Sequence, residues 1–287
     1  CQSIETVSVF AATVDEALSV LRVIAGYDAA DPYARPPPYP HLRRAAAPPG
    51  ARIAAIDARP LCDPEVAEVY ASAAAHLDAE TIDIAPLLAI GRLLYDGPWV
   101  AERTAALREV VERRLEILHP VTRAILESGF ARRAVDAFDA FHAVAAARRQ
   151  AAELFARYDA LLLPTAPSTP TLAELETDPI APNSRLGTYT TFVNLCDLAG
   201  FAVPAGFAAN GLPVGVTLVG PAWSEGRLAP LADALHRARL SRVGATRMPL
   251  PPGGAPDPLG RDETALFCVG AHMSGLPLNG ALTRRGG

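Results

Sequence analysis

The feature that most constrains the fold is a continuous apolar run at residues 159–165, which contains a proline and follows a long helix-like segment. A short run of this kind predicts a β-strand that is buried on both faces. Both faces are buried when helices cover the two sides of a sheet. A second short apolar run, residues 52–56, is followed by a helix-like segment at residues 63–79. We therefore predict an α/β fold in which sheet and helices form layers.

Composition narrows the class of protein further. At 287 residues, half of them hydrophobic, the chain is long enough for one large domain or two modest ones. The net charge of −5 is mild and the basic residues are scattered, so nucleic acid is not expected as a partner. The sequence has no apolar run that could span a bilayer and no signal peptide, so we expect no membrane association.

Four cysteines are widely spaced without a C-x-x-C pair, which favours reduced thiols in a cytoplasmic protein over a disulfide framework. They are Cys1, Cys62, Cys196 and Cys268. Cys268 and His272 are four residues apart, but their glycine-rich surroundings make a poor helix and no third ligand lies near in the sequence. The histidines form no H-E-x-x-H motif. The sequence therefore predicts neither a metal site nor a cofactor.

The chain contains no lysine, so all 26 of its basic residues are arginine. It begins with Cys1 shortly before strand-like or extended sequence at residues 6–11, and it ends soon after a new apolar segment begins. We expect the chain to be part of a longer protein.

Local signals predict helices and turns. Thr13 followed three residues later by Glu16 is a capping-box pattern at the start of a helix over residues 14–26. Asn210-Gly211 between two apolar segments predicts a hairpin turn. Residues 165–182 are rich in proline, which predicts a loop.

A long helix is predicted over residues 134–157. Its core candidates are Phe138, Phe141, Leu154 and Phe155.

Residues 84–95 and 100–117 both read as helix, and Asp96-Gly97-Pro98 separates them. Glycine tolerates unusual φ angles, and proline biases the residue before it away from the helical region. Tyr95 is thus predicted to end one helix and Arg103 to lie near the start of the next. A phenol and a guanidinium then face one shared space across a rigid corner.

This corner predicts a pocket for a small anionic substrate, because the guanidinium fork of arginine matches the two oxygens of a carboxylate. The alternative is an ordinary surface, on which Tyr95 snorkels and Arg103 pairs with Glu102, Asp96 or water. Spacing alone leaves both interpretations open.

Other candidate residues point to no catalytic group. The sequence has no G-x-S-x-G motif of a serine nucleophile. His119 and His142 lie in helix-like sequence and are expected to be packing or surface residues. Asp28 and Asp31 lie in a turn, where aspartate bonds its own backbone.

Several segments resemble the amidase signature family. Residues 2–6, 14–26 and 28–32 are similar to the middle of that fold, and residues 159–167 and 192–220 are similar to its later half. The corner from Tyr95 to Arg103 and residues 192–198 and 202–207 resemble the allophanate hydrolase branch. Residues 269–279 resemble the opening of the C-terminal domain of that branch.

This resemblance implies a partial amidase-type mixed β-sheet layered with helices, and a division into three parts. Residues 1–245 are the later portion of the amidase domain, 246–264 a linker rich in proline and glycine, and 265–287 the beginning of a second domain. It also implies hydrolysis of allophanate to ammonia and carbon dioxide, with a Ser–cis-Ser–Lys triad. Without lysine the chain cannot carry that triad, so we assign it no catalytic residue and expect it to be inactive alone.

The same resemblance implies that Tyr95 and Arg103 hold the carboxylate of a small anionic amide, and that the protein is a homodimer. Two alternatives stay open. One is another amidase, including the glutamine amidase type that serves tRNA amidation. The other is a non-catalytic binding remnant.

Overall fold

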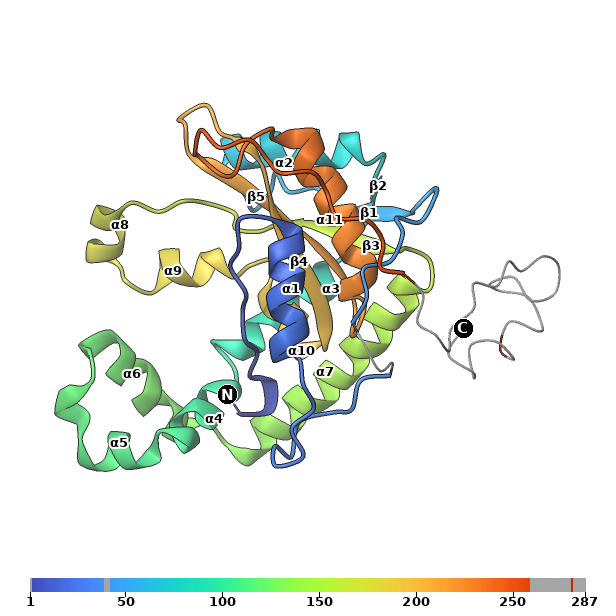
Figure 1. Cartoon of the computed structure of the whole chain (residues 1–287). Coiled ribbons are helices and arrows are strands. Elements are labelled where there is room, and N and C mark those ends of the chain that lie inside the picture. The colour runs from blue at the N-terminus through green and yellow to red at the C-terminus, as the bar shows by residue number, and fades with distance from the viewer. Residues whose placement is uncertain (1, 39–41, 259–279, 281–287) are drawn as a thin grey trace.

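The computed structural model describes residues 2–38, 42–258 and 280 of the chain. Within these residues, the centre is a five-stranded mixed sheet with the order β2–β1–β3–β5–β4 (Figure 1). β1 runs parallel to β2 and β3, whereas β5 runs antiparallel to β3 and β4. The strands are β1 (Ile53–Ala55), β2 (Glu80–Thr81), β3 (Ala160–Pro164), β4 (Leu198–Phe207) and β5 (Pro213–Pro221).

Helices pack against this sheet and extend beyond it at one end (Figure 1). The α-helices are α1 (Val14–Ile24), α2 (Pro64–His76), α3 (Ala85–Gly91), α4 (Trp99–Ala106), α5 (Arg108–Arg113), α6 (Pro120–Ser128), α7 (Ala134–Phe155), α8 (Leu172–Thr177), α9 (Ala181–Leu186), α10 (Thr191–Leu195) and α11 (Glu225–Arg239). Short 3-10 helices are η1 (Gln2–Ile4), η2 (Arg92–Leu94), η3 (Leu115–Ile117) and η4 (Gly129–Ala131).

The central strand β3 confirms the prediction made from its apolar run. Every residue of β3 is buried, and the strand lies between β1 and β5. The hydroxyl of Tyr70 on α2 accepts a hydrogen bond from Ile56 N (2.9 Å) and donates one to Leu162 O (2.9 Å). These bonds fix α2 against the neighbouring strands. The α/β prediction, with a mixed sheet layered with helices, is confirmed.

The predicted cap and turn are also confirmed. Thr13 Oγ1 accepts a hydrogen bond from Glu16 N (3.2 Å) at the start of α1. Asn210 and Gly211 connect β4 to β5, and Gly211 adopts a φ of +82°, which glycine reaches without steric cost. Asp28 and Asp31 accept hydrogen bonds from backbone N–H groups two residues on, as expected of turn residues.

Residues 6–11 are strand-like in sequence but form no strand. Val7 and Phe10, the apolar residues that a strand would bury, are exposed. A β-prone sequence becomes a strand only where a neighbouring strand accepts its backbone hydrogen bonds. The described sheet offers none at this place.

Two of the four core candidates on α7 are wrong. Phe138 and Phe141 are 65% and 57% exposed, whereas Leu154 is buried and Phe155 packs at the edge of the core. Phe141 instead meets the ring of Trp99 edge-to-face, with the centroids 5.6 Å apart. The apolar character of these four residues does not by itself identify which side of α7 the sheet covers.

The proline-rich segment at residues 165–182 is not entirely loop, because it contains α8 and the start of α9. Thr171 and Glu174 form a capping box at the start of α8, with the side chain of each bonded to the backbone N–H of the other. The Thr-x-x-Glu spacing in the sequence is the signal that predicts the start of this helix.

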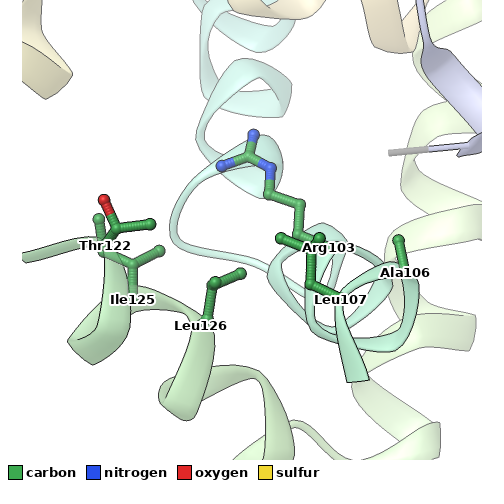
Figure 2. A pocket seen from close by; sticks show the side chains of 6 residues that line it. All are labelled: Arg103, Ala106, Leu107, Thr122, Ile125 and Leu126. Atoms are coloured by element: carbon green, nitrogen blue, oxygen red, sulfur yellow. The ribbon is translucent and has the colours of Figure 1, made fainter. Parts of the chain in front are cut away.

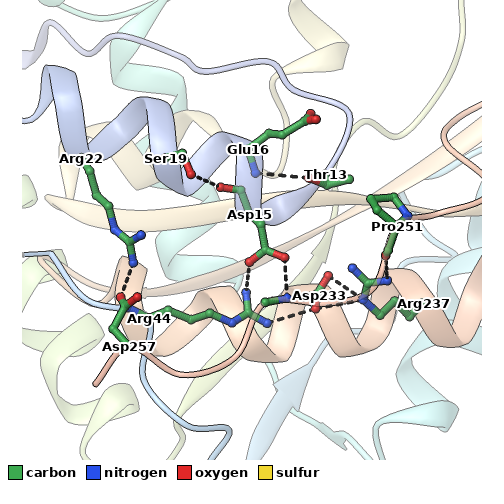
Figure 3. A network of polar contacts seen from close by, with 11 residues as sticks. Thr13, Asp15, Glu16, Ser19, Arg22, Arg44, Asp233, Arg237, Pro251 and Asp257 are labelled. Carbon is green, nitrogen blue, oxygen red and sulfur yellow. Dashed lines mark hydrogen bonds and ion pairs between the residues drawn. The ribbon is translucent and has the colours of Figure 1, made fainter. Parts of the chain in front are cut away.

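A polar network fastens α1, α11 and residues 249–258 together (Figure 3). At its centre, the buried guanidinium of Arg44 pairs with Asp15 on α1 (2.7 Å) and with Asp233 on α11 (3.0 Å). Arg44 N also donates to Asp257 Oδ2 (2.6 Å), and Asp257 pairs with Arg22. The network holds the segment after α11 against α1 and α11 as far as Asp257.

The second domain predicted at residues 265–287 falls almost entirely outside the described residues, as do Cys268 and His272. The division at residues 245 and 264 therefore stays a prediction. Across the ranges that are described, none of the helices has the length and apolar character needed to cross a membrane.

Candidate substrate-binding site

The corner between α3 and α4 is a tight turn that only glycine fits. η2 follows α3 directly, Tyr95 closes η2, and α4 begins at Trp99. A Cβ atom on Gly97 would lie 2.5 Å from the backbone oxygen of Leu93, closer than real atoms approach. This close approach brings the end of η2 back against the start of α4. The predicted break at residues 96–98 is confirmed.

Tyr95 and Arg103 lie together, as the sequence predicts. The guanidinium carbon of Arg103 is 4.6 Å from the ring centroid of Tyr95, which is cation–π geometry. Arg103 is half-buried and Tyr95 is 46% exposed. The two side chains therefore form one face that solvent and a small ligand can reach.

The position of Arg103 along its helix differs from the prediction. We expected Arg103 near the start of a helix that continued to residue 117, but α4 ends at Ala106 and Arg103 lies in its last turn. The helical stretch is interrupted at Leu107 and again at Arg114. Arg103 thus carries its charge close to the C-terminal end of a helix, where the helix dipole favours a cation.

Neither acidic neighbour pairs with Arg103. Throughout the described ranges, Arg103 has neither an ion pair nor a hydrogen bond; its contact is with the ring of Tyr95. Glu102 instead accepts hydrogen bonds from Ser3 N (2.6 Å) and Ser3 Oγ (2.7 Å). Of the three partners that the surface interpretation offers Arg103, which are Glu102, Asp96 and water, neither of the two acidic residues binds it. The N–H groups of the guanidinium are available to an anion.

Residues of α10 and of the turn before it complete the surroundings of Tyr95. A Cβ on Gly187 would lie 3.7 Å from Tyr95 Cε2 and 2.8 Å from Thr191 Cγ2. On the other side, a Cβ on Gly91 would lie 2.3 Å from Thr191 Oγ1. Gly91 thus allows α3 and α10 to approach closely, and Gly187 leaves room for the turn before α10 beside Tyr95. Sequence reasoning missed Thr191 and Gly187, because residues so distant in sequence carry no common local signal.

A hollow of about 430 Å³ adjoins Arg103 between α4 and α6 (Figure 2). The guanidinium extends over the gap between the two helices, while Leu107 and Leu126 form part of the apolar wall. The full lining is Arg103, Ala106, Leu107, Thr122, Ile125 and Leu126. Tyr95 does not line this hollow, so only the Arg103 member of the stacked pair is part of its wall.

The remaining candidates supply no nucleophile or metal site. Cys62 and Cys196 are buried free thiols; burial raises the pKa of Cys62, and raises that of Cys196 to about 11. A thiol with a raised pKa stays protonated and unreactive at neutral pH. His119 and His142 are exposed on the surface. No group of metal-binding side chains occurs among the residues that the structure describes.

Residues 1–229 match the family model described as Amidase. The match covers most of the chain, so the chain belongs to the Amidase family.

Relatives within this family are longer proteins. The chain is 34% identical, over 97% of its length, to the urea amidolyase of Lachancea kluyveri, of which it spans 16%. It superimposes on the allophanate hydrolase of Kluyveromyces lactis with a TM-score of 0.81 and 30% identity, covering 99% of this chain and 49% of that one. The A subunit of the glutamyl-tRNA(Gln) amidotransferase of Lachnospira eligens is 43% identical over 30% of the chain, which covers 18% of that protein.

Proposed function

We propose that this chain is the substrate-recognition part of an amidohydrolase of the allophanate hydrolase type. The observation that carries the proposal is the stacked Tyr95–Arg103 pair, whose guanidinium has no acidic partner among the described residues. Similarity to urea amidolyase and to allophanate hydrolase along nearly the whole chain supports it.

In this proposal, Arg103 pairs with the carboxylate of allophanate and the ring of Tyr95 keeps the guanidinium oriented. A carboxylate satisfies two guanidinium N–H groups at once. A neutral amide of the same shape leaves that charge unpaired, so the pair selects for an anionic substrate.

The proposal assigns no chemical step to these 287 residues. The triad of the amidase signature family needs a lysine, and the sequence contains none. We therefore propose that the nucleophile and its base belong to sequence outside this chain, in a longer cytoplasmic protein that forms a homodimer. The domain boundaries at residues 245 and 264 belong to the same proposal. We expect the chain to bind allophanate-like carboxylates without releasing ammonia from them.

Binding of an unreactive isostere tests the proposal directly. Malonamate keeps the carboxylate and the carboxamide of allophanate but replaces the central N–H by CH₂, and malonamide is its neutral counterpart. Isothermal titration should detect malonamate and not malonamide. Arg103→Ala should weaken malonamate binding by about 10- to 100-fold, the size of a lost charge-assisted hydrogen-bonded pair. Tyr95→Phe, which keeps the ring, should weaken it less than Tyr95→Leu.

Arg123→Ala is the matched control, because Arg123 lies on neighbouring α6 and pairs with Glu127 at the surface. Its affinity for malonamate should equal that of the unchanged chain. An affinity for malonamate that Arg103→Ala leaves within twofold would refute the carboxylate role.

Binding of malonamide as tightly as malonamate would favour the second candidate function, an amidase for neutral carboxamides. The partial similarity to a glutamyl-tRNA(Gln) amidotransferase keeps that candidate open.

A further inference from the structure

We propose that Ser3 is a positioning residue for Arg103: it holds the carboxylate of Glu102 away and so keeps the guanidinium free for a ligand anion. The inference rests on the proposed function, because it concerns the same anion site. It makes substrate recognition depend on Ser3, a residue that is distant from Arg103 in the sequence.

The contact between Ser3 and Glu102 occupies both carboxylate oxygens. Glu102 Oε1 accepts from Ser3 N (2.6 Å) and Glu102 Oε2 accepts from Ser3 Oγ (2.7 Å), and both bonds are partly shielded from solvent. Hydrogen bonds to an ionised carboxylate are among the stronger ones in proteins. The charge of Glu102 is therefore directed toward η1.

Glu102 is the acidic residue that directly precedes Arg103 in the sequence. Both residues lie in α4, and adjacent residues of a helix leave it in directions about 100° apart. In the observed rotamers Glu102 reaches Ser3 and Arg103 reaches Tyr95. Once released from Ser3, the flexible Glu102 side chain can swing toward the guanidinium, and as a tethered anion it then competes with a dissolved ligand.

The segment that presents Ser3 is itself fixed in place. Ile4 packs against the small apolar cluster that contains Leu94 and Trp99, on either side of the corner. Thr6 Oγ1 accepts a hydrogen bond from Asn194 Nδ2 (3.4 Å) on α10. Ser3 therefore meets α4 in a defined position, and its hydroxyl can hold Glu102 continuously.

Malonamate titration of single and double variants tests this role. Ser3→Ala removes one of the two bonds to Glu102 and should weaken binding by about 2- to 5-fold, the range of a partly exposed ion pair that now competes. Ser3→Thr keeps the hydroxyl and should bind as the unchanged chain does. The double variant Ser3→Ala/Glu102→Gln should regain full affinity, because the competing charge is gone.

Restored affinity in the double variant is the result that a merely structural role of Ser3 does not produce. Ser128→Ala is the control, since Ser128 also donates a side-chain hydrogen bond, to Ile125 O (2.7 Å), and lies near the site. The inference is overturned if Ser3→Ala binds normally or if the double variant stays as weak as Ser3→Ala. If Arg103→Ala leaves malonamate binding unchanged, the proposed function itself fails. If Arg103→Ala weakens binding but the Ser3 variants do not behave as expected, only the inference about Ser3 fails. The two failures are therefore distinguishable.

Discussion

At the scale of single residues, the behaviour of a charged or titratable side chain depends on its burial and on the groups within hydrogen-bonding distance. Arg103 has no acidic partner among the described residues, although Glu102 precedes it. His236, by contrast, is buried on α11 and its Nε2 has no hydrogen-bond partner in the described structure. Burial lowers the pKa of His236 from its ordinary value of 6.5, and this outweighs the attraction of Asp233.

His236 should make the folded state less stable in mild acid. Near pH 8 the imidazole is neutral in both states, so it contributes no pH dependence. As the pH falls through 6.5, the unfolded chain takes up a proton that the folded chain resists, and the free energy of unfolding decreases. Urea unfolding at pH 7.5 and pH 5.5 should reveal this loss, and His236→Gln should make it smaller.

Glu225 contributes to the pH dependence of the free energy of unfolding with the opposite sign, because burial raises its pKa and the folded state holds its proton more tightly. The comparison of the unchanged chain with His236→Gln removes this contribution, which both share. An equal pH dependence in the two proteins would show that His236 is not responsible.

At the scale of elements, the corner between α3 and α4 is held by close backbone approach. A Cβ atom on Gly97 would clash with the backbone of Leu93, and a Cβ atom on Gly91 would clash with Thr191 on α10. The stacked pair depends on this geometry, because Tyr95 closes η2 on one side and Arg103 projects from α4 on the other.

Gly97→Ala should therefore open the corner and disturb both stability and binding. The added methyl group would meet Leu93 O at 2.5 Å and Leu93 Cα at 2.6 Å, and neither backbone atom can move alone. We expect a loss of about 1–3 kcal/mol in the free energy of unfolding, as for an overpacked core, and weaker malonamate binding. Gly26→Ala, whose methyl group would have no neighbour within 4 Å, should change neither. Equal effects of the two substitutions would contradict this explanation.

At the scale of the whole molecule, the network around Arg44 joins segments that lie far apart in the sequence (Figure 3). Asp15, Arg44 and Asp233 come from three separate parts of the chain, and Gly254 N donates to Asp15 (2.7 Å). The network thus couples α1 and α11 to the path of residues 249–258.

Arg44→Met should destabilise the chain strongly, because it leaves the buried carboxylate of Asp233 with Arg237 alone. Breaking one side of a buried ion pair costs on the order of 3 kcal/mol. Urea unfolding measures this loss, and hydrogen exchange should reveal faster exchange at Gly254. Arg149→Met, which removes an exposed pair with Glu153, should cost less than about 1 kcal/mol. Slow exchange at Gly254 in Arg44→Met would show that other contacts hold the segment.

The sequence by itself determined the features that depend on neighbours along the chain. The buried strand β3, the cap at Thr13, the hairpin at Asn210-Gly211 and the break at residues 96–98 all follow from local backbone preferences and apolar patterning. The family also followed from the sequence, because runs of residues resembled it at several places.

Only the tertiary structure decided which residues contact one another. Whether residues 6–11 become a strand depends on a neighbouring strand, and whether Phe138 is core depends on what packs over α7. That Glu102 bonds Ser3 and leaves Arg103 to Tyr95 was equally undetermined, since a carboxylate binds whichever donors folding brings within reach. Hydrogen bonds, ion pairs and burial are set by distances in space, and a single sequence does not fix those for residues a hundred positions apart.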